Sequence, residues 1–407
     1  MNIVVLSPVV CGANCGHGGG ILSYGQLQRL AARHEVHFIS FFKENDSGLH
    51  DPGCVEDLKR ICASVNLVPL NTGLWQRVYS KLSLLLNFKP NDAAFLSSKT
   101  MTDRLREVVT KRCADVVLFQ FPSMAQYVSA CPDVSTVLDV HDAFSVSYFR
   151  KFRAEKSWLK RSYFFFIWLS WLRYEIHYYS RFDKLYTLTE QDRYGLQIFS
   201  PELTVAVIPA AVDVVKKMSL PAPLAKKSIL FVGSFFHAPN IDAVRYFLGE
   251  VFPLVVQRLP DVEFVVVGKG ADLYFKQYES GQVHFRGFVD DIHMVYASAT
   301  IVVIPVRFGG GVKIKTIEAM ANCCPMVSTS LGVEETGAQD DLHVMIADTP
   351  EDFAKKVVML LQDDTLRGCL AKNARELALD RFSWESRTGQ LEQLLEQAAL
   401  LRRPGLS

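Results

Sequence analysis

The sequence predicts an α/β protein built from two successive doubly wound domains, each with a parallel sheet between layers of helices. Three observations support this fold class. Short apolar strand patterns alternate with helical patterns in both halves of the chain, and a glycine-rich turn follows a strand in each half. The proline-containing segment over residues 214–227 is typical of a linker between them. The length of 407 residues allows each half its own core.

The composition excludes several classes of protein. Lys and Arg number 44 against 43 Asp and Glu, so no basic surface suited to nucleic acid is expected. The nine cysteines are scattered without zinc-ribbon spacing, which favours reduced thiols, a cytoplasmic location and no bound metal. The chain opens directly on a strand pattern without a secretory signal, and its longest apolar run, residues 163–172, is shorter than the roughly 20 residues of a membrane span.

The first half opens with a strand over residues 2–7, a glycine-rich loop, a helix over residues 21–33 and a strand over residues 36–41. Gly18, Gly19 and Gly20 come just before that helix, where backbone N–H groups and the helix dipole favour an anion. A plain tight turn is the alternative. No acidic residue ends the second strand to hold an adenine ribose, which argues against a dinucleotide site.

Strands are predicted over residues 116–120 and 136–140, after a poorly patterned region with helical patches at residues 55–62 and 103–111. The second strand ends in a titratable cluster that includes Asp139, His141 and Asp142. Carboxyl ends of parallel strands carry the chemistry of α/β folds, so His141 is a candidate acid or base. Asp142 would orient its ring or cap the next helix. A capped loop with a structural histidine is the alternative.

A basic, aromatic stretch over residues 151–181 is predicted to form one long helix. Aromatic residues flanked by Lys and Arg suit peripheral contact with a membrane, whereas apolar residues all round a helix indicate burial in a core. A contact between copies of the chain is a third use of the same surface. Strands over residues 185–188 and 205–209 complete this half, with a helix opened by a capping pattern at Thr189 between them.

The second half repeats the architecture. Further strands are predicted over residues 228–232, 263–268, 283–289, 300–304 and 325–330, with late helices over residues 351–362 and 364–377 and a final helix from Trp384. The first of these strands leads into a loop with Gly233 and His237. Glycine at the end of a strand lets a ligand approach the backbone closely.

The most informative stretch follows the strand over residues 300–304. Three glycines, including Gly310 and Gly311, precede a helical pattern in which Lys315 and Glu318 lie three residues apart and so share one face. Lysine supplies a charge for a phosphate, and glutamate offers two acceptor oxygens to a ribose diol. Additional cations for the phosphate are Arg307 and Lys313. A glycine turn with a solvated ion pair is the alternative.

The pattern from Pro305 to Ser328, Pro-x-x-x-Gly-Gly-Gly-x-x-x-Lys-x-x-Glu-Ala-Met-Ala with its following strand, resembles the donor-site signature of retaining family-4 glycosyltransferases of the GT-B fold. The resemblance implies two Rossmann-like domains facing across a cleft. Residues 1–212 would bind the acceptor, residues 213–380 the donor, and residues 381–407 would pack back on the first domain. Gly310 stands where the wider family has a glutamate, and Ala210-Ala211 replaces an Asn-Gly pair.

The resemblance also implies roles for individual residues. In the family, a histidine matching His141 faces the donor sugar, and the N-terminal glycine loop meets the donor diphosphate. Residues matching Phe288 and Val289 pack around the base, and Lys315 and Glu318 hold diphosphate and ribose. The implied activity is that of a hexosyltransferase of polysaccharide biosynthesis. It would use a UDP- or GDP-linked sugar as co-substrate, without a cofactor or metal, and transfer the sugar with retention to a glycan, lipid-linked or small-molecule acceptor.

Two other functions fit the same pattern. One is a nucleotide-sugar epimerase or phosphorylase on the GT-B fold, which needs no acceptor chain. The other is a non-catalytic GT-B binding subunit, which the missing acid at Gly310 favours. Lys315, Glu318 and His141 favour an enzyme. The location implied is cytoplasmic, at the inner face of the membrane if the segment over residues 151–181 binds lipid.

Overall fold

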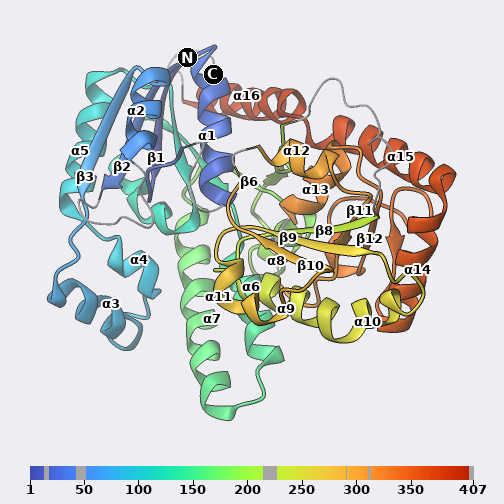
Figure 1. The fold of residues 1–407 in the computed structure, drawn as a ribbon. Helices are drawn as coiled ribbons and strands as arrows, with labels where there is room; N and C mark the ends of the chain where they lie inside the picture. The colour runs from blue at the N-terminus through green and yellow to red at the C-terminus, as the bar shows by residue number, and fades with distance from the viewer. Residues whose placement is uncertain (13–17, 43–51, 214–226, 290, 310–312, 403–407) are drawn as a thin grey trace. The chain divides into compact units, whose positions relative to one another are not determined.

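The computed structural model describes residues 1–12, 18–42, 52–213, 227–289, 291–309 and 313–402. The chain forms two compact units (Figure 1). Unit 1 consists of Met1–Pro209 together with Arg387–Ser407, and unit 2 consists of Ala210–Ser386. The chain therefore passes between the units twice, three residues before and six residues after the boundaries expected at 212/213 and 380/381.

Unit 1 is built on a seven-stranded parallel sheet in the order β3-β2-β1-β4-β5-β6-β7. Its strands are β1 (Asn2–Ser7), β2 (Glu35–Phe42), β3 (Ser64–Pro69), β4 (Val116–Gln120), β5 (Ser135–Val140), β6 (Lys184–Thr187) and β7 (Val205–Val207). Every residue of β4 and β5 is buried, because helices cover both faces of a parallel sheet. The edge strand β3 is half-buried, and its mixed sequence carries no continuous apolar run.

The helices of unit 1 are α1 (Gly18–Ala31), α2 (Pro52–Ile61), α3 (Leu74–Leu86), α4 (Asn91–Phe95), α5 (Lys99–Lys111), α6 (Phe144–Ala154), α7 (Trp158–Tyr179), α8 (Glu190–Phe199) and α16 (Trp384–Leu401), with a 3₁₀ segment at Pro122–Ala130. The prediction of one long helix over residues 151–181 is wrong. Glu155 leaves the helical conformation, and its carboxylate accepts the Ser157 N–H at 2.9 Å, which separates α6 from α7.

Unit 2 has a six-stranded parallel sheet in the order β10-β9-β8-β11-β12-β13. Its strands are β8 (Ser228–Val232), β9 (Glu263–Val267), β10 (Val283–Arg286), β11 (Ile301–Ile304), β12 (Met326–Ser328) and β13 (Met345–Ile346). Its helices are α9 (Ala238–Tyr246), α10 (Phe252–Val256), α11 (Ala271–Phe275), α12 (Ile292–Ala297), α13 (Ile314–Ala321), α14 (Pro350–Gln362) and α15 (Asp364–Phe382).

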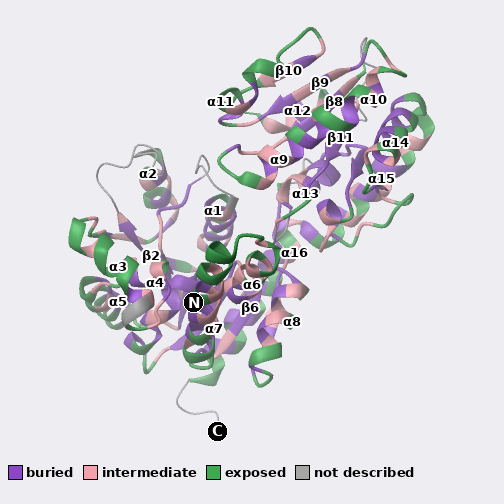
Figure 2. Cartoon of the chain, turned by 90° about the horizontal axis from the view of Figure 1, so that it is seen from below, coloured by how far each residue is buried: buried purple, intermediate pink, exposed green. Residues whose placement is uncertain are grey.

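Each unit has its own hydrophobic core. The apolar cluster of unit 1 runs from Val4 to Val205 in the sequence, and that of unit 2 from Val212 to Phe382. Figure 2 shows the buried residues concentrated along the strands and the exposed residues on the outer faces of the helices. The final helix α16 packs on unit 1, where the Ser135 hydroxyl donates to the Ala398 carbonyl at 2.8 Å.

The strand orders place one topological switch point in each sheet. In unit 1 the order reverses between β1 and β4, and in unit 2 it reverses between β8 and β11. Connections leaving the two strands at such a point go to opposite faces of the sheet and leave a crevice at the carboxyl ends, where open α/β sheets bind ligands. The loop after β8 contains Gly233, and the loop after β11 contains the glycine stretch that begins at Gly309. Among the helices in the described parts of the chain, none is both long and apolar enough to cross a membrane.

Candidate functional site

The switch point of unit 2 brings Gly233, Asn240 and Lys315 together. A Cβ on Gly233 would lie 2.8 Å from the Asn240 amide nitrogen and 3.0 Å from the Lys315 amine, so a larger residue would displace these side chains. Asn240, in the first turn of α9, anchors the loop by donating to the Ser234 carbonyl at 2.8 Å. A Cβ on Gly268, which has a φ of +147°, would lie 1.9 Å from the Gly233 carbonyl oxygen. The backbone is therefore closely packed around the lysine.

Lys315 projects from the first turn of α13 into this crevice. Its amine donates to the side-chain oxygen of Asn240 and lies 4.5 Å from the centre of the Phe231 ring. Burial lowers the pKa of the amine to about 7, since the negative charge of Glu318 offsets only part of the lost hydration. An anion entering the crevice would favour the ammonium form, so Lys315 is a candidate phosphate-binding residue.

Glu318 lies on the same face of α13, one turn after Lys315. The Tyr296 hydroxyl donates to its Oε2 at 3.2 Å. Burial raises the pKa of the carboxyl, although this hydrogen bond and the nearby Lys315 act in the opposite direction. The predicted spacing of a cation and a carboxylate on one face is therefore present, with a tyrosine holding the carboxylate.

The two additional cations are each engaged by carboxylates. Arg307 binds both oxygens of Asp242 at 2.7 and 3.0 Å. Lys313 is buried, and its amine lies 3.4 Å from Glu334. Between these two cations, Gly309 has a φ of +118°, which favours glycine. Gly310 and Gly311, predicted to offer N–H groups to the donor, lie outside the described residues.

The remaining predicted donor residues of unit 2 surround the same sheet edge. His237 is exposed and is the N-cap of α9, three residues before Asn240. Phe288, two residues past β10, is 64% exposed, whereas Val289 packs against the core of unit 2. An exposed aromatic ring at a strand's carboxyl end is available to a planar ligand.

In unit 1, His141 follows β5 and meets the predicted glycine stretch. Its ring stacks on Phe121 with centroids 4.0 Å apart. A Cβ on Gly19 would lie 3.2 Å from the Phe121 ring and 3.6 Å from Cδ2 of His141. Gly18 and Gly20 lie with Gly19 in the first turn of α1, so the turn that was expected before the helix is part of it.

His141 pairs with Asp139, a buried residue of β5. Nδ1 of His141 lies 3.1 Å from Oδ1 of Asp139, a side chain without any exposed surface. Burial by itself raises the pKa of Asp139, but the charges of His141 and Arg387 and the hydroxyl of Tyr186 outweigh it and hold that pKa below its usual value. Asp142 is not the N-cap of α6 that was predicted, because that position is occupied by Ala143.

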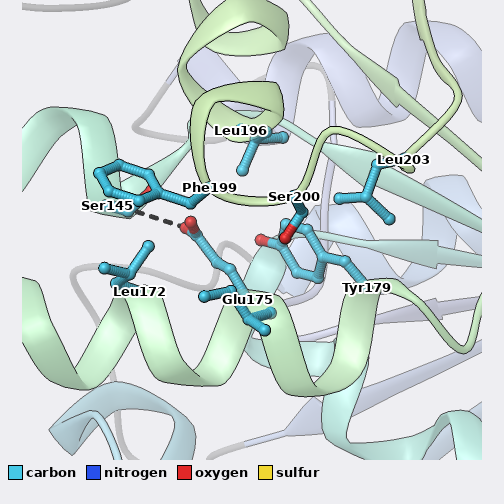
Figure 3. Close-up of a pocket in the computed structure, with 9 residues that line it drawn as sticks. Ser145, Leu172, Glu175, Tyr179, Leu196, Phe199, Ser200 and Leu203 are labelled. Carbon is cyan, nitrogen blue, oxygen red and sulfur yellow. Dashed lines mark hydrogen bonds between the residues drawn. The ribbon is translucent and has the colours of Figure 1, made fainter.

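A small pocket lies between α6, α7 and α8 of unit 1 (Figure 3). Glu175 points into it, and its Oε1 accepts the Ser145 N–H at 3.1 Å. Burial raises the pKa of this carboxyl to about 7. Since Ala143 has no side-chain acceptor, Glu175 takes over the capping of α6 from a neighbouring helix. The pocket is thus part of the support for the segment that follows His141.

The sequence did not reveal several contacts of the site. Tyr296 is 22 residues before Glu318, and Phe121 is 20 residues before His141, so no local spacing connects them. Asn240 lies in the first turn of α9, and its polar character is the one sequence signal for its role. In the described parts of the chain, no group of three or more His, Cys, Asp or Glu side chains is arranged to hold a metal ion.

Comparison with known sequences gives a partial and a nearly full-length likeness. Residues 226–363 match the family model described as "Glycosyl transferases group 1". An "uncharacterized 44.6 kDa protein in cps region" of Klebsiella pneumoniae is 26% identical over 400 residues, covering 94% of this chain and 95% of that protein. The phosphatidyl-myo-inositol mannosyltransferase of Mycobacterium tuberculosis is 30% identical over 188 residues, 44% of this chain. The chain spans about half the length of that enzyme (49%).

Solved structures share the fold along nearly the whole chain. Sucrose-phosphate synthase from Thermosynechococcus elongatus gives a TM-score of 0.69 at 16% identity, covering 98% of this chain and 100% of that one. HepE of Anabaena, in complex with UDP and glucose, gives 0.66 at 15% identity with the same coverage. TarM of S. aureus, in complex with UDP among other ligands, gives 0.65 at 12% identity, covering 97% and 100%.

Proposed function

We propose that the protein, which has the GT-B fold and matches the group 1 glycosyltransferase model over residues 226–363, is a nucleotide-sugar glycosyltransferase with the following donor and acceptor classes. The donor is a UDP- or GDP-linked hexose bound by unit 2, and the acceptor is a glycan or lipid-linked chain bound by unit 1. The observation that carries the proposal is the placement of Lys315 and Glu318 at the switch point of the second sheet.

The nucleotide binds in the crevice after β8 and β11. The Lys315 amine contacts the diphosphate in place of, or beside, Asn240, and Glu318 accepts hydrogen bonds from the ribose hydroxyls while Tyr296 holds its other side. Arg307 contributes less than expected from the sequence, because its guanidinium already pairs with Asp242. Lys315 therefore carries most of the phosphate binding among the described side chains.

The reaction breaks the bond between the anomeric carbon and the diphosphate, and a new bond forms from that carbon to an acceptor oxygen. The leaving diphosphate takes both electrons of the broken bond and receives the acceptor proton. Positive groups already in place at the diphosphate lower the barrier, and removing one such donor typically costs ~100-fold or more in rate. We assign that role to Lys315 and a contact with the donor sugar to His141. Retention of the anomeric configuration follows from the family resemblance and is tested by NMR of the product.

The two nucleotide classes have separate support. The HepE structures contain UDP, which favours a UDP-sugar, whereas the mycobacterial relatives are named mannosyltransferases. The same relatives act on phosphatidyl-myo-inositol, which supports a lipid-linked acceptor. The family resemblance implies a role in polysaccharide biosynthesis, which supports a glycan acceptor.

We further propose that unit 1 contacts an anionic membrane surface through the tip of the α6–α7 hairpin, residues 149–163, which extends away from the sheet of unit 1 (Figure 1). Trp158 and Leu159 are 73% and 63% exposed there. Six cations accompany a single acid, Glu155, in this stretch. Exposed aromatic and aliphatic side chains among Lys and Arg match the interface of an anionic bilayer. One face of the second half of α7 is buried, so the helix serves both as core and as contact surface.

The first experiment is calorimetric titration of UDP, GDP and ADP into the wild type and the Glu318→Ala variant. One of the three should bind, and the variant should bind it about tenfold or more weakly, which corresponds to the loss of a hydrogen bond to a charged group. Glu279→Ala, an exposed glutamate of unit 2, is the matched control and should leave affinity unchanged.

Absence of binding by all three nucleotides to the folded wild type would contradict the proposed donor site. Incubation with UDP-glucose or GDP-mannose without acceptor distinguishes a transferase from a nucleotide-sugar epimerase. Slow release of free sugar fits a transferase, whereas an isomerised nucleotide sugar identifies an epimerase.

A further inference from the structure

Behind His141, buried polar side chains from distant parts of unit 1 form a continuous chain. Oδ1 of Asp139 lies 3.1 Å from Nδ1 of His141, and Asp139 is the cross-strand neighbour of Tyr186, whose hydroxyl lies near its carboxylate. The Gln26 amide donates to that hydroxyl at 3.2 Å, and Arg387 donates to the Gln26 side-chain oxygen at 2.8 Å. Each of the five side chains comes from a different element or its end: α1, β5, the loop after β5, β6 and α16.

All five residues are nearly inaccessible to solvent. The exposed fraction is 0% for Asp139 and Tyr186, 2% for Gln26 and Arg387, and 7% for His141. Two opposite charges and three polar groups at such depth lose much hydration, and an apolar core would avoid that cost. Their shared connection to His141 is a reason for their presence that packing alone does not supply.

Backbone carbonyl groups hold Arg387, the member of this row of side chains that lies farthest from His141. Besides Gln26, Arg387 donates to the carbonyl oxygens of Ile208, at 2.8 Å, and of Pro209. Pro209 is the last residue of unit 1 before the chain first leaves it, and Arg387 is the first residue after the chain returns. One guanidinium thus joins both crossing segments to the interior of unit 1.

The residues next to His141 determine the tautomer and the orientation of its imidazole ring. Contact with the carboxylate at Nδ1 favours the tautomer that carries its proton there, which leaves a lone pair on Nε2. Stacking on Phe121 fixes the ring plane. The Cδ2 edge, next to Nε2, faces Gly19 in the first turn of α1. The free nitrogen is therefore held on the glycine side of the ring.

We propose that Asp139, Tyr186, Gln26 and Arg387 are positioning residues that hold His141 with its proton on Nδ1 and Nε2 free for the donor sugar. This proposal rests on the proposed function only in the identity of the ligand that meets Nε2. The arrangement of the ring itself can be measured without any substrate.

Tyr186→Phe is the sharpest test because it removes a single oxygen from the middle of the chain and keeps the ring. Tyr179→Phe is the matched control. Tyr179 is also fully buried in unit 1, lines the pocket of Figure 3, and its hydroxyl has no hydrogen-bond partner among the described residues. Both variants make the same chemical change at the same burial.

Two readouts are combined. Nitrogen-15 NMR of labelled histidine rings reports the tautomer of His141, with its signal assigned from the His141→Gln variant. Hydrolysis of UDP-glucose and GDP-mannose reports kcat and KM for donor turnover. Tyr186→Phe should move His141 away from the Nδ1-protonated tautomer and lower kcat about tenfold, the worth of one internal hydrogen bond, with KM within about twofold.

Arg387 tests the far end. Arg387→Met should shift the tautomer in the same direction, and Arg387→Lys should restore part of it by keeping a charge near Gln26. Arg402→Met is the control, since Arg402 directly follows the same helix and also donates to one side-chain oxygen, of Asp183, and to a backbone carbonyl, of Pro132. If Arg387→Met does not fold by circular dichroism, Tyr186→Phe decides the question alone.

The proposal is overturned if Tyr186→Phe leaves the tautomer of His141 as Tyr179→Phe does. A wild type that turns over neither donor, but whose tautomer responds to Tyr186→Phe, would contradict the assigned donors and support the positioning chain. The two proposals therefore fail by different measurements.

Discussion

Lys315 and Arg307 come from the same region of the chain, but their surroundings affect their charges differently. Arg307 keeps its charge at all accessible pH values and forms an ion pair with Asp242. Lys315 has an amide oxygen and an aromatic ring as neighbours, and its pKa falls to about 7 through burial. The lysine is therefore the group whose charge a bound diphosphate would change.

We predict that nucleotide binding weakens as pH rises above about 7. The free amine titrates near that value, while a bound diphosphate favours the ammonium, so binding above pH 7 requires uptake of a proton. The dissociation constant for UDP or GDP should rise by up to about tenfold per pH unit between pH 7 and 9. Calorimetry in Tris and in HEPES, whose ionisation enthalpies differ, measures the proton uptake directly.

Lys315→Arg provides the control for this linkage. Arginine stays charged throughout the range, so the variant should bind with an affinity independent of pH above 7. A wild-type dissociation constant that stays constant from pH 7 to pH 9 would refute the linkage.

At the scale of elements, the support of the loop after β5 comes from helix α7. Helix α6 begins with Ala143 as N-cap, which has no side-chain acceptor, and Glu175 of α7 accepts the Ser145 N–H instead. Nearby Asp192, on α8, also has its pKa raised by burial, to about 6. Three helices thus meet at carboxyl groups that change charge close to neutral pH.

We predict that Glu175 makes the folded state less stable as pH rises. Its pKa is about 7 in the folded protein against 4.5 for the free side chain, so the folded state binds more protons between these values. Its stabilising contribution is therefore complete below about pH 4.5 and is lost as pH rises through 7. Glu175→Gln keeps the acceptor without the charge, and its stability relative to wild type should increase by about 1–3 kcal/mol from pH 5 to pH 8.

Urea unfolding at the two pH values measures this difference. Glu202→Gln, at an exposed position of unit 1, should show the same offset from wild type at both. Equal offsets for Glu175→Gln would show that the carboxyl does not titrate between pH 5 and pH 8.

At the scale of the whole molecule, the surface of unit 1 carries an apolar and basic projection that its core does not use. Besides the α6–α7 tip, helix α3 presents Leu74 and Trp75 with 74% and 85% exposure. The ring contact between Phe88, just after α3, and Phe166 of α7 joins the two elements. Side chains of this kind are stable at a bilayer interface, where the rings meet the headgroups and the cations meet anionic lipid.

We predict that the protein sediments with vesicles containing phosphatidylglycerol and not with phosphatidylcholine alone. Reversing two charges of the tip, Lys160→Glu with Arg161→Glu, should weaken binding at least about tenfold, because each basic residue near the surface contributes about 1 kcal/mol. Added salt should weaken wild-type binding in the same direction. Lys355→Glu with Lys372→Glu, exposed on unit 2, makes the same change in net charge and should have little effect.

Equal binding to neutral and anionic vesicles, or equal losses in both double variants, would contradict a specific role of the tip. Binding in pull-down to a second copy of the chain, lost with the same tip variant, would assign the surface to self-association instead.

The strands show how much of the fold can be predicted from the local sequence. Apolar runs of four to six residues predicted β1, β4, β8 and β11 to within one residue at each end, because strands buried on both faces need such runs. The edge strand β3 and the helices α3 and α4 were not predicted, since half-buried elements have mixed sequences. The break between α6 and α7 depends on a side-chain contact of Glu155 that no periodicity shows.

The sequence by itself determined the two α/β halves, the glycosyltransferase signature and the pairing of Lys315 with Glu318, because strand patterns and helical spacing are set by neighbours in the chain. Only the tertiary structure decided that Lys315 meets Asn240, that His141 pairs with Asp139, and that Arg387 reaches Gln26, which lies 361 residues earlier. Such contacts depend on strand order and on where the returning helix packs. A buried polar group is satisfied by whichever partner the fold brings to it, and that partner has no fixed distance in the sequence.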